Sequence, residues 1–155
     1  MKNSSKLFSL IKSLSMSEKR YFKLLCSVQK GMKGYLKLFD AIDNLTDHNE
    51  KLLVQMLQDE RLIKRLRVAK NYLYKLILKS LRHYNENFSI DIRLKNLLME
   101  TEILYKKGLF KQGEEILIKA KYLANKHKKY LPIIEILTWE KELLYTGGFT
   151  QKPGN

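Results

Sequence analysis

The sequence predicts an all-α protein, and three observations support this fold class. Proline and glycine are scarce, with two and seven copies in 155 residues, so a helix meets few residues that would break it. No segment alternates polar and apolar residues as a half-buried strand would. Apolar residues instead recur three and four positions apart, which is the spacing of an amphipathic helix. We therefore expect a helical bundle or α-solenoid of about seven to eight helices.

The residue pattern in the first part of the chain predicts two helices, with a capping signal at the start of the second. Apolar residues between positions 7 and 14 fall on one face of a short helix, although an anchor on a membrane surface would show a similar pattern. Ser15 and Glu18 then form an S-x-x-E capping box, in which the side chain of each residue accepts the backbone N–H of the other. The second helix follows and ends near Gly31.

Two further helices are expected before residue 60. One covers residues 35–45, with its apolar residues on the inner side. Asp47 and Glu50 resemble a second capping box, which predicts a short helix that ends at about Leu57.

Residues 61–84 predict one long amphipathic helix around which the rest of the chain is organised. At about 100° per residue, one broad face collects apolar side chains and the opposite face collects basic ones. Asp59 and Glu60 precede this helix, where carboxylates stabilise the positive end of the helix dipole. The segment itself contains no acidic residue. The expected core face consists of Leu62, Leu66, Ala69, Leu73, Leu76, Ile77, Leu81 and Tyr84.

Charge is distributed unevenly along the chain, whose formal net charge is +14. Residues 1–88 carry 18 Lys and Arg against 8 Asp and Glu, whereas residues 89–155 carry 12 against 8. Such a field attracts polyanions, including nucleic acid, anionic lipid and acidic proteins. The excess of lysine over arginine is also what an A/T-rich genome produces without any function, so both explanations stay open.

The chain is expected to divide into two parts and a tail. Residues 1–88 form a basic helical N-terminal subdomain, residues 89–146 form a helical hairpin with one extra helix, and residues 147–155 form a flexible tail. Ser89 is the expected N-cap of the first helix of the second part, and Pro132 suits the first turn of the last helix.

Catalytic and metal-binding patterns are not visible in the sequence. His48, His83 and His127 lie on separate segments, and no nucleophile or dinucleotide motif is present. Cys26 is the single cysteine, which excludes an internal disulfide, and its apolar helical setting predicts a buried, inert thiol. No stretch approaches 18 uninterrupted apolar residues and no cleavable leader is evident. We expect a cytoplasmic protein without catalytic activity, metal, cofactor or membrane span.

The second part resembles a tetratricopeptide repeat, a helix-turn-helix unit of about 34 residues. Gly108, Phe110, Leu117 and Ala120 have the spacing of the small turn residue, the aromatic residue and the packing positions of that motif. Gly113 stands where the motif has alanine. Leu97 replaces the usual tryptophan, and Glu100 and Thr101 replace the usual Leu-Gly pair.

The whole chain also resembles uncharacterised bacterial helical proteins. In those proteins an SEKRYFK-like segment, here residues 17–23, and a KNYLYKLILKSLR-like segment, here residues 70–82, precede tetratricopeptide-like helices. This resemblance implies a helical repeat fold and no known activity.

A second repeat unit is only half present. Residues 131–145 match the first helix of another unit, but the following residues offer no second helix to cover it. An open apolar edge near Trp139 and Leu143 is therefore expected. Three explanations remain open: the chain is the N-terminal part of a longer repeat protein, it forms a homodimer through this edge, or the last helix folds back onto residues 1–60.

These features predict an interaction module that binds a protein partner, and its lysines favour an acidic one. The candidate partner-binding residues are Trp139, Leu143, Tyr105 and Phe110. The first alternative is a nucleic-acid-binding helical domain that uses a candidate polyanion-binding surface, here named the basic stripe, with Tyr72 and Tyr74 beside it. The second alternative is a structural, homo-oligomeric assembly subunit. The basic stripe consists of Lys64, Arg67, Asn71, Lys75, Lys79 and Arg82.

Overall fold

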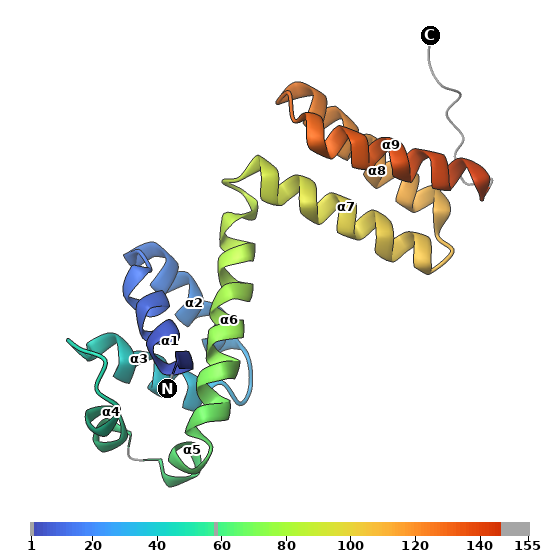
Figure 1. Cartoon of the computed structure of the whole chain (residues 1–155). Helices are drawn as coiled ribbons and strands as arrows, with labels where there is room; N and C mark the ends of the chain where they lie inside the picture. The colour runs from blue at the N-terminus through green and yellow to red at the C-terminus, as the bar shows by residue number, and fades with distance from the viewer. Residues whose placement is uncertain (1, 58, 147–155) are drawn as a thin grey trace. The chain divides into compact units, whose positions relative to one another are not determined.

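The computed structural model describes residues 2–57 and 59–146. Within these residues the chain forms nine helices and no strand, which confirms the all-α prediction (Figure 1). The count exceeds the expected seven to eight because the long helix of residues 61–84 is divided in two. The helices are α1 (Lys2–Ser13), α2 (Met16–Val28), α3 (Lys33–Asn44), α4 (Glu50–Met56), α5 (Glu60–Lys64), α6 (Leu66–Glu86), α7 (Ile90–Lys106), α8 (Phe110–Lys126) and α9 (Tyr130–Tyr145).

The chain divides into two compact units after Tyr84, and each unit has its own core. The sequence placed this boundary after residue 88. The flexible tail expected at residues 147–155 lies outside the described residues.

Helix α6 supplies one continuous buried stripe to the core of the first unit. Leu66, Ala69, Leu73 and Ile77 of the expected core face are buried at the predicted spacing of three or four, and Lys70 and Ser80 are buried although the pattern did not predict them. Buried residues of α1 to α4, including Leu7, Phe22, Phe39 and Leu53, complete the same core.

The prediction of one continuous helix over residues 61–84 is wrong in one respect, because the helix is interrupted at Arg65. The backbone of Arg65 has φ −114° and ψ 20°, and its N–H donates to the carbonyls of Leu62 and Ile63. Asp59 caps the short α5 by accepting the N–H groups of Arg61 and Leu62. Hydrophobic spacing misses this break, since Leu62 and Leu66 pack against the same core on either side of it.

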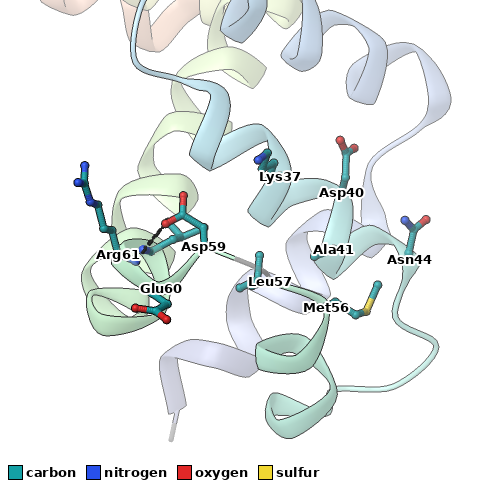
Figure 2. A pocket seen from close by; sticks show the side chains of 10 residues that line it. Lys37, Asp40, Ala41, Asn44, Met56, Leu57, Asp59, Glu60 and Arg61 are labelled. Atoms are coloured by element: carbon teal, nitrogen blue, oxygen red, sulfur yellow. Dashed lines mark hydrogen bonds between the residues drawn. The ribbon is translucent and has the colours of Figure 1, made fainter.

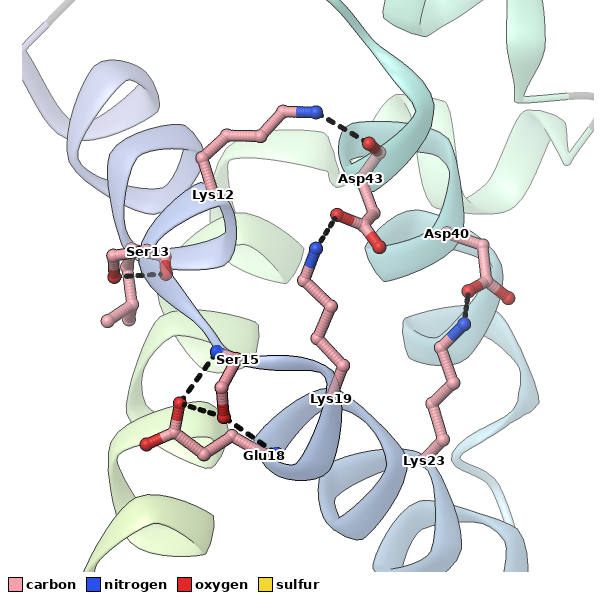
Figure 3. Close-up of polar contacts among 9 residues, drawn as sticks. Lys12, Ser13, Ser15, Glu18, Lys19, Lys23, Asp40 and Asp43 are labelled. Carbon is pink, nitrogen blue, oxygen red and sulfur yellow. Dashed lines mark hydrogen bonds and ion pairs between the residues drawn. The ribbon is translucent and has the colours of Figure 1, made fainter.

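Capping signals locate three helix starts. The capping box of Ser15 and Glu18 is confirmed, with the Ser15 N–H donating to Glu18 Oε2 over 2.8 Å (Figure 3). Ser89 caps α7 as expected. The prediction for α4 is corrected, because Asn49 and not Asp47 accepts the N–H of Leu52.

Ion pairs join α2 to α3 along one side of the first unit (Figure 3). Lys19 Nζ lies 2.6 Å from Asp43 Oδ1, and Lys23 Nζ lies 2.6 Å from Asp40 Oδ1. Lys12 of α1 donates to the backbone carbonyl of Asp43 over 2.6 Å. Carboxylates on the outer side of α3 therefore neutralise lysines of α2.

Lys70 is a buried lysine on α6, and its charge is neutralised by α4. The Lys70 ammonium lies 2.7 Å from Glu50 Oε1, and its side chain is only 6% exposed, against 55% for Glu50. The hydrogen bond and the charge of Lys70 hold the pKa of the Glu50 carboxyl below its ordinary value.

The second unit is a stack of three helices in which α8 packs against both α7 and α9. Gly108 ends the α7–α8 turn with φ +71°, a left-handed conformation that suits glycine. Gly113 lies at the crossing of α7 and α8, where a Cβ would meet Leu104 Cβ and the Thr101 carbonyl at 3.8 Å. Lys121 of α8 and Glu140 of α9 form an ion pair at 2.8 Å.

Two glycine-to-alanine substitutions in the second unit are expected to have opposite effects. Gly113→Ala should raise the free energy of unfolding by about 0.5–1 kcal/mol, because the added methyl fits and the unfolded chain loses freedom. Gly108→Ala should lower it by about 1 kcal/mol, because φ is positive there. Urea unfolding followed by Trp139 fluorescence measures both changes. A loss of stability in Gly113→Ala would mean that the α7–α8 crossing is tighter than described.

The Lys70–Glu50 pair is expected to make stability depend on pH. Its contribution is complete above the ordinary pKa of a glutamate and disappears as pH falls through the lower pKa of folded Glu50. Glu50→Gln should therefore lower the free energy of unfolding by at most about 1 kcal/mol at neutral pH, because Glu50 is half-exposed, and by progressively less as pH falls below the ordinary glutamate pKa of about 4.3. Urea unfolding by circular dichroism at several pH values measures this. The matched control is Glu115→Gln, which removes an exposed carboxylate of α8 and should show no such trend; an equal trend in both variants would contradict the assignment.

Candidate functional site

Helix α9 presents apolar side chains on two sides. Ile136 and Leu143 point into the core of the second unit, as do the partly buried Ile133 and Trp139. The opposite side is exposed, with exposed fractions of 63% for Ile134 and 52% for Leu144. We name this side the outer face of α9; it consists of Tyr130, Ile134, Leu137, Leu144 and Tyr145, with Lys141 among them.

The candidate partner-binding residues lie on the inner side of α9 and in its neighbours, so the predicted open edge is wrong in position. Leu143 is completely buried. Trp139 packs edge-on against Tyr105, with ring centroids 5.5 Å apart, and Tyr105 packs against Phe110 at 5.4 Å. These residues hold α7, α8 and α9 together. The sequence signal that could have found the outer face is the row at 130, 134, 137, 141 and 144, spaced four, three, four and three residues apart.

The basic stripe is exposed along its whole length, but two helices carry it. Lys64 belongs to α5, before the break at Arg65, and the other five residues follow one another along α6. Arg67, Lys75, Lys79 and Arg82 make no ion pair with any described residue.

A cavity of about 370 Å³ lies beside the basic stripe, between α1 and α6. Asn71, Tyr74 and Lys75 of α6 line it together with Lys6 of α1. Sequence reasoning missed Lys6, because its position next to α6 follows from the packing of α1 on the core and not from any local pattern.

A larger cavity of about 870 Å³ lies between α3 and the segment that joins α4 to α5 (Figure 2). Its wall mixes acids and bases, including Asp40, Asp59, Glu60, Lys37 and Arg61. Two of the three acids have structural roles, since Asp40 pairs with Lys23 and Asp59 caps α5. The cavity wall therefore carries both positive and negative charges and would not select a ligand by its charge.

The groups that usually carry chemistry are dispersed. Cys26 is buried between α2 and the core, and this burial raises the pKa of its thiol, as expected for an inert cysteine. Within residues 2–57 and 59–146, no three of the His, Cys, Asp and Glu side chains are grouped as a metal site would require.

Two sets of residues therefore remain as candidate binding surfaces: the outer face of α9, and the basic stripe with its adjoining cavity. None of the described helices combines the length and the apolar character that crossing a bilayer requires. Comparisons of this chain with models of protein families, with curated proteins and with solved structures gave no match.

Proposed function

We propose that this chain is a non-enzymatic interaction module that binds an amphipathic helix of a partner protein on the outer face of α9. The observation that carries this proposal is the exposure of five apolar side chains on one face of a helix whose other side contributes Ile136 and Leu143 to the core. Isolated apolar residues are normal on protein surfaces, whereas a contiguous row of this kind is typical of a binding surface.

The stacking of the second unit supports a helix as the occupant. Helix α8 buries one side on α7 and another on α9, as helices of tetratricopeptide-like repeats do. A partner helix on the outer face of α9 would extend the same stack by one layer. Its apolar residues would follow the spacing of Ile134, Leu137 and Leu144, as in other complexes where a helix binds through one apolar face.

Lys141 gives the partner helix a charge preference. It lies in the middle of the outer face, with its ammonium 5.9 Å from the centroid of the Tyr145 ring. A partner helix with an acidic residue beside its apolar row would pair with Lys141, which favours the correct register and partner. The expected occupant is thus an amphipathic, acidic helix.

Selection of helical peptides tests the proposal without a known partner. A display library of amphipathic peptides is selected against the purified chain, and the dissociation constants of the selected peptides are measured by fluorescence anisotropy. We expect acidic amphipathic helices, and we expect the double variant Ile134→Ser/Leu144→Ser to raise their dissociation constants by roughly tenfold or more, because two central apolar contacts are lost.

The matched control is Met99→Ser/Ile103→Ser, which removes two exposed apolar side chains from α7. It should leave the dissociation constants nearly unchanged. The fluorescence of Trp139, which packs on the inner side, checks that both variants keep the core of the second unit. Equal affinity of the peptides for the outer-face variant would overturn the proposal. So would light scattering that shows a homodimer lost in the same variant, because the occupant would then be a second copy.

A further inference from the structure

We infer that the cavity between α1 and α6 is a binding site for a phosphate group of single-stranded nucleic acid, and that the basic stripe continues this site along α6. Among the residues that the structure describes, Lys6, Asn71, Tyr74 and Lys75 line the cavity. Lysine ammonium groups donate hydrogen bonds to phosphate oxygens and add charge attraction. This inference concerns the first unit and does not depend on the proposed role of α9.

The positive charge at this cavity is not neutralised by the helices that form it. Neither α1 nor residues 61–85 contain an acidic residue. Most acids of the first unit are engaged elsewhere: Asp40, Asp43 and Glu50 form ion pairs, and Glu18 and Asp59 cap helices. Lys6 and Lys75 make no ion pair with any residue between 2 and 146 that the structure describes. Lys12, Lys19, Lys23 and Lys70 thus interact with groups of the first unit, whereas Lys6 and Lys75 are available to an external anion.

The arrangement of the basic stripe favours a chain of phosphates over a single anion. Arg67, Asn71, Lys75, Lys79 and Arg82 follow one another at three or four residues along α6. At 1.5 Å per residue, the distance from Arg67 to Arg82 is about 22 Å. A row of this length can contact several successive phosphates of one strand, and each contact releases bound counterions.

Aromatic residues beside the stripe favour a single strand, whose bases are open to stacking. Tyr74 forms part of the cavity wall, and Tyr72 is 42% exposed although its ring also packs against Tyr35. Base stacking on tyrosine needs no particular sequence, so binding with little sequence preference is expected.

The test compares two variants with the same loss of charge. Lys6→Gln/Lys75→Gln removes both cavity lysines, whereas Lys33→Gln/Lys51→Gln removes two exposed lysines from α3 and α4. Binding of a short, labelled single-stranded oligonucleotide of mixed sequence to the full chain is measured by fluorescence anisotropy over a series of salt concentrations. Circular dichroism and thermal unfolding check that all variants fold.

We expect the cavity variant to weaken binding by roughly tenfold or more at low salt. The slope of log K against log salt should fall in magnitude by about 0.7, since the cavity binds one phosphate and each lost phosphate contact on a single strand accounts for about 0.7. The control variant should leave the slope nearly unchanged. Equal changes in the two variants would overturn the site, because they would reflect net charge alone. The inference also fails if the cavity lysines govern binding to vesicles of anionic lipid while the oligonucleotide does not bind.

Discussion

The first unit depends on the burial of one side of α6. Four apolar residues on that side, Leu66, Ala69, Leu73 and Ile77, contact a core to which α1, α2, α3 and α4 all contribute. Complete burial of a Leu or Ile contributes about 1.5–3 kcal/mol, which is a large fraction of the net stability of a domain of this size. Because this side of α6 must face the core, the row that starts at Arg67 must face solvent. The same constraint that folds the unit therefore also places Arg67, Lys75, Lys79 and Arg82 together on one exposed side of α6.

Much of this architecture could be predicted from local chemistry. The capping box at Ser15, the cap at Ser89 and the core face of α6 all follow from signals within a few residues, and the structure contains each of them. The interruption at Arg65 could not be predicted, since the apolar positions keep their spacing across it. Contacts between residues far apart in the sequence could not be predicted either. Examples are the position of Lys6 at the cavity beside α6 and the burial of Lys70 against Glu50.

The apolar residues on both sides of α9 explain why the sequence placed the candidate partner surface on the inner side of this helix. Periodicity identifies an inner face only when the opposite face is polar, and α9 has apolar residues on both sides. The sequence predicted an open apolar edge on α9, and the exposed apolar side chains of this helix include Ile134, Leu137 and Leu144. Choosing between its two sides required the packing of Trp139 on Tyr105, which turns that tryptophan inward and leaves Ile134 exposed.

The exposed row on α9 also has a consequence for the behaviour of the protein at high concentration. Apolar rows on separate molecules attract one another, whereas a net charge of +14 makes the molecules repel. Salt weakens only the repulsion, because the screening length falls from about 10 Å at 0.1 M to about 3 Å at 1 M. A rise in ionic strength is thus expected to favour association through the outer face of α9, and the abundant lysines are expected to keep the molecules apart at low salt.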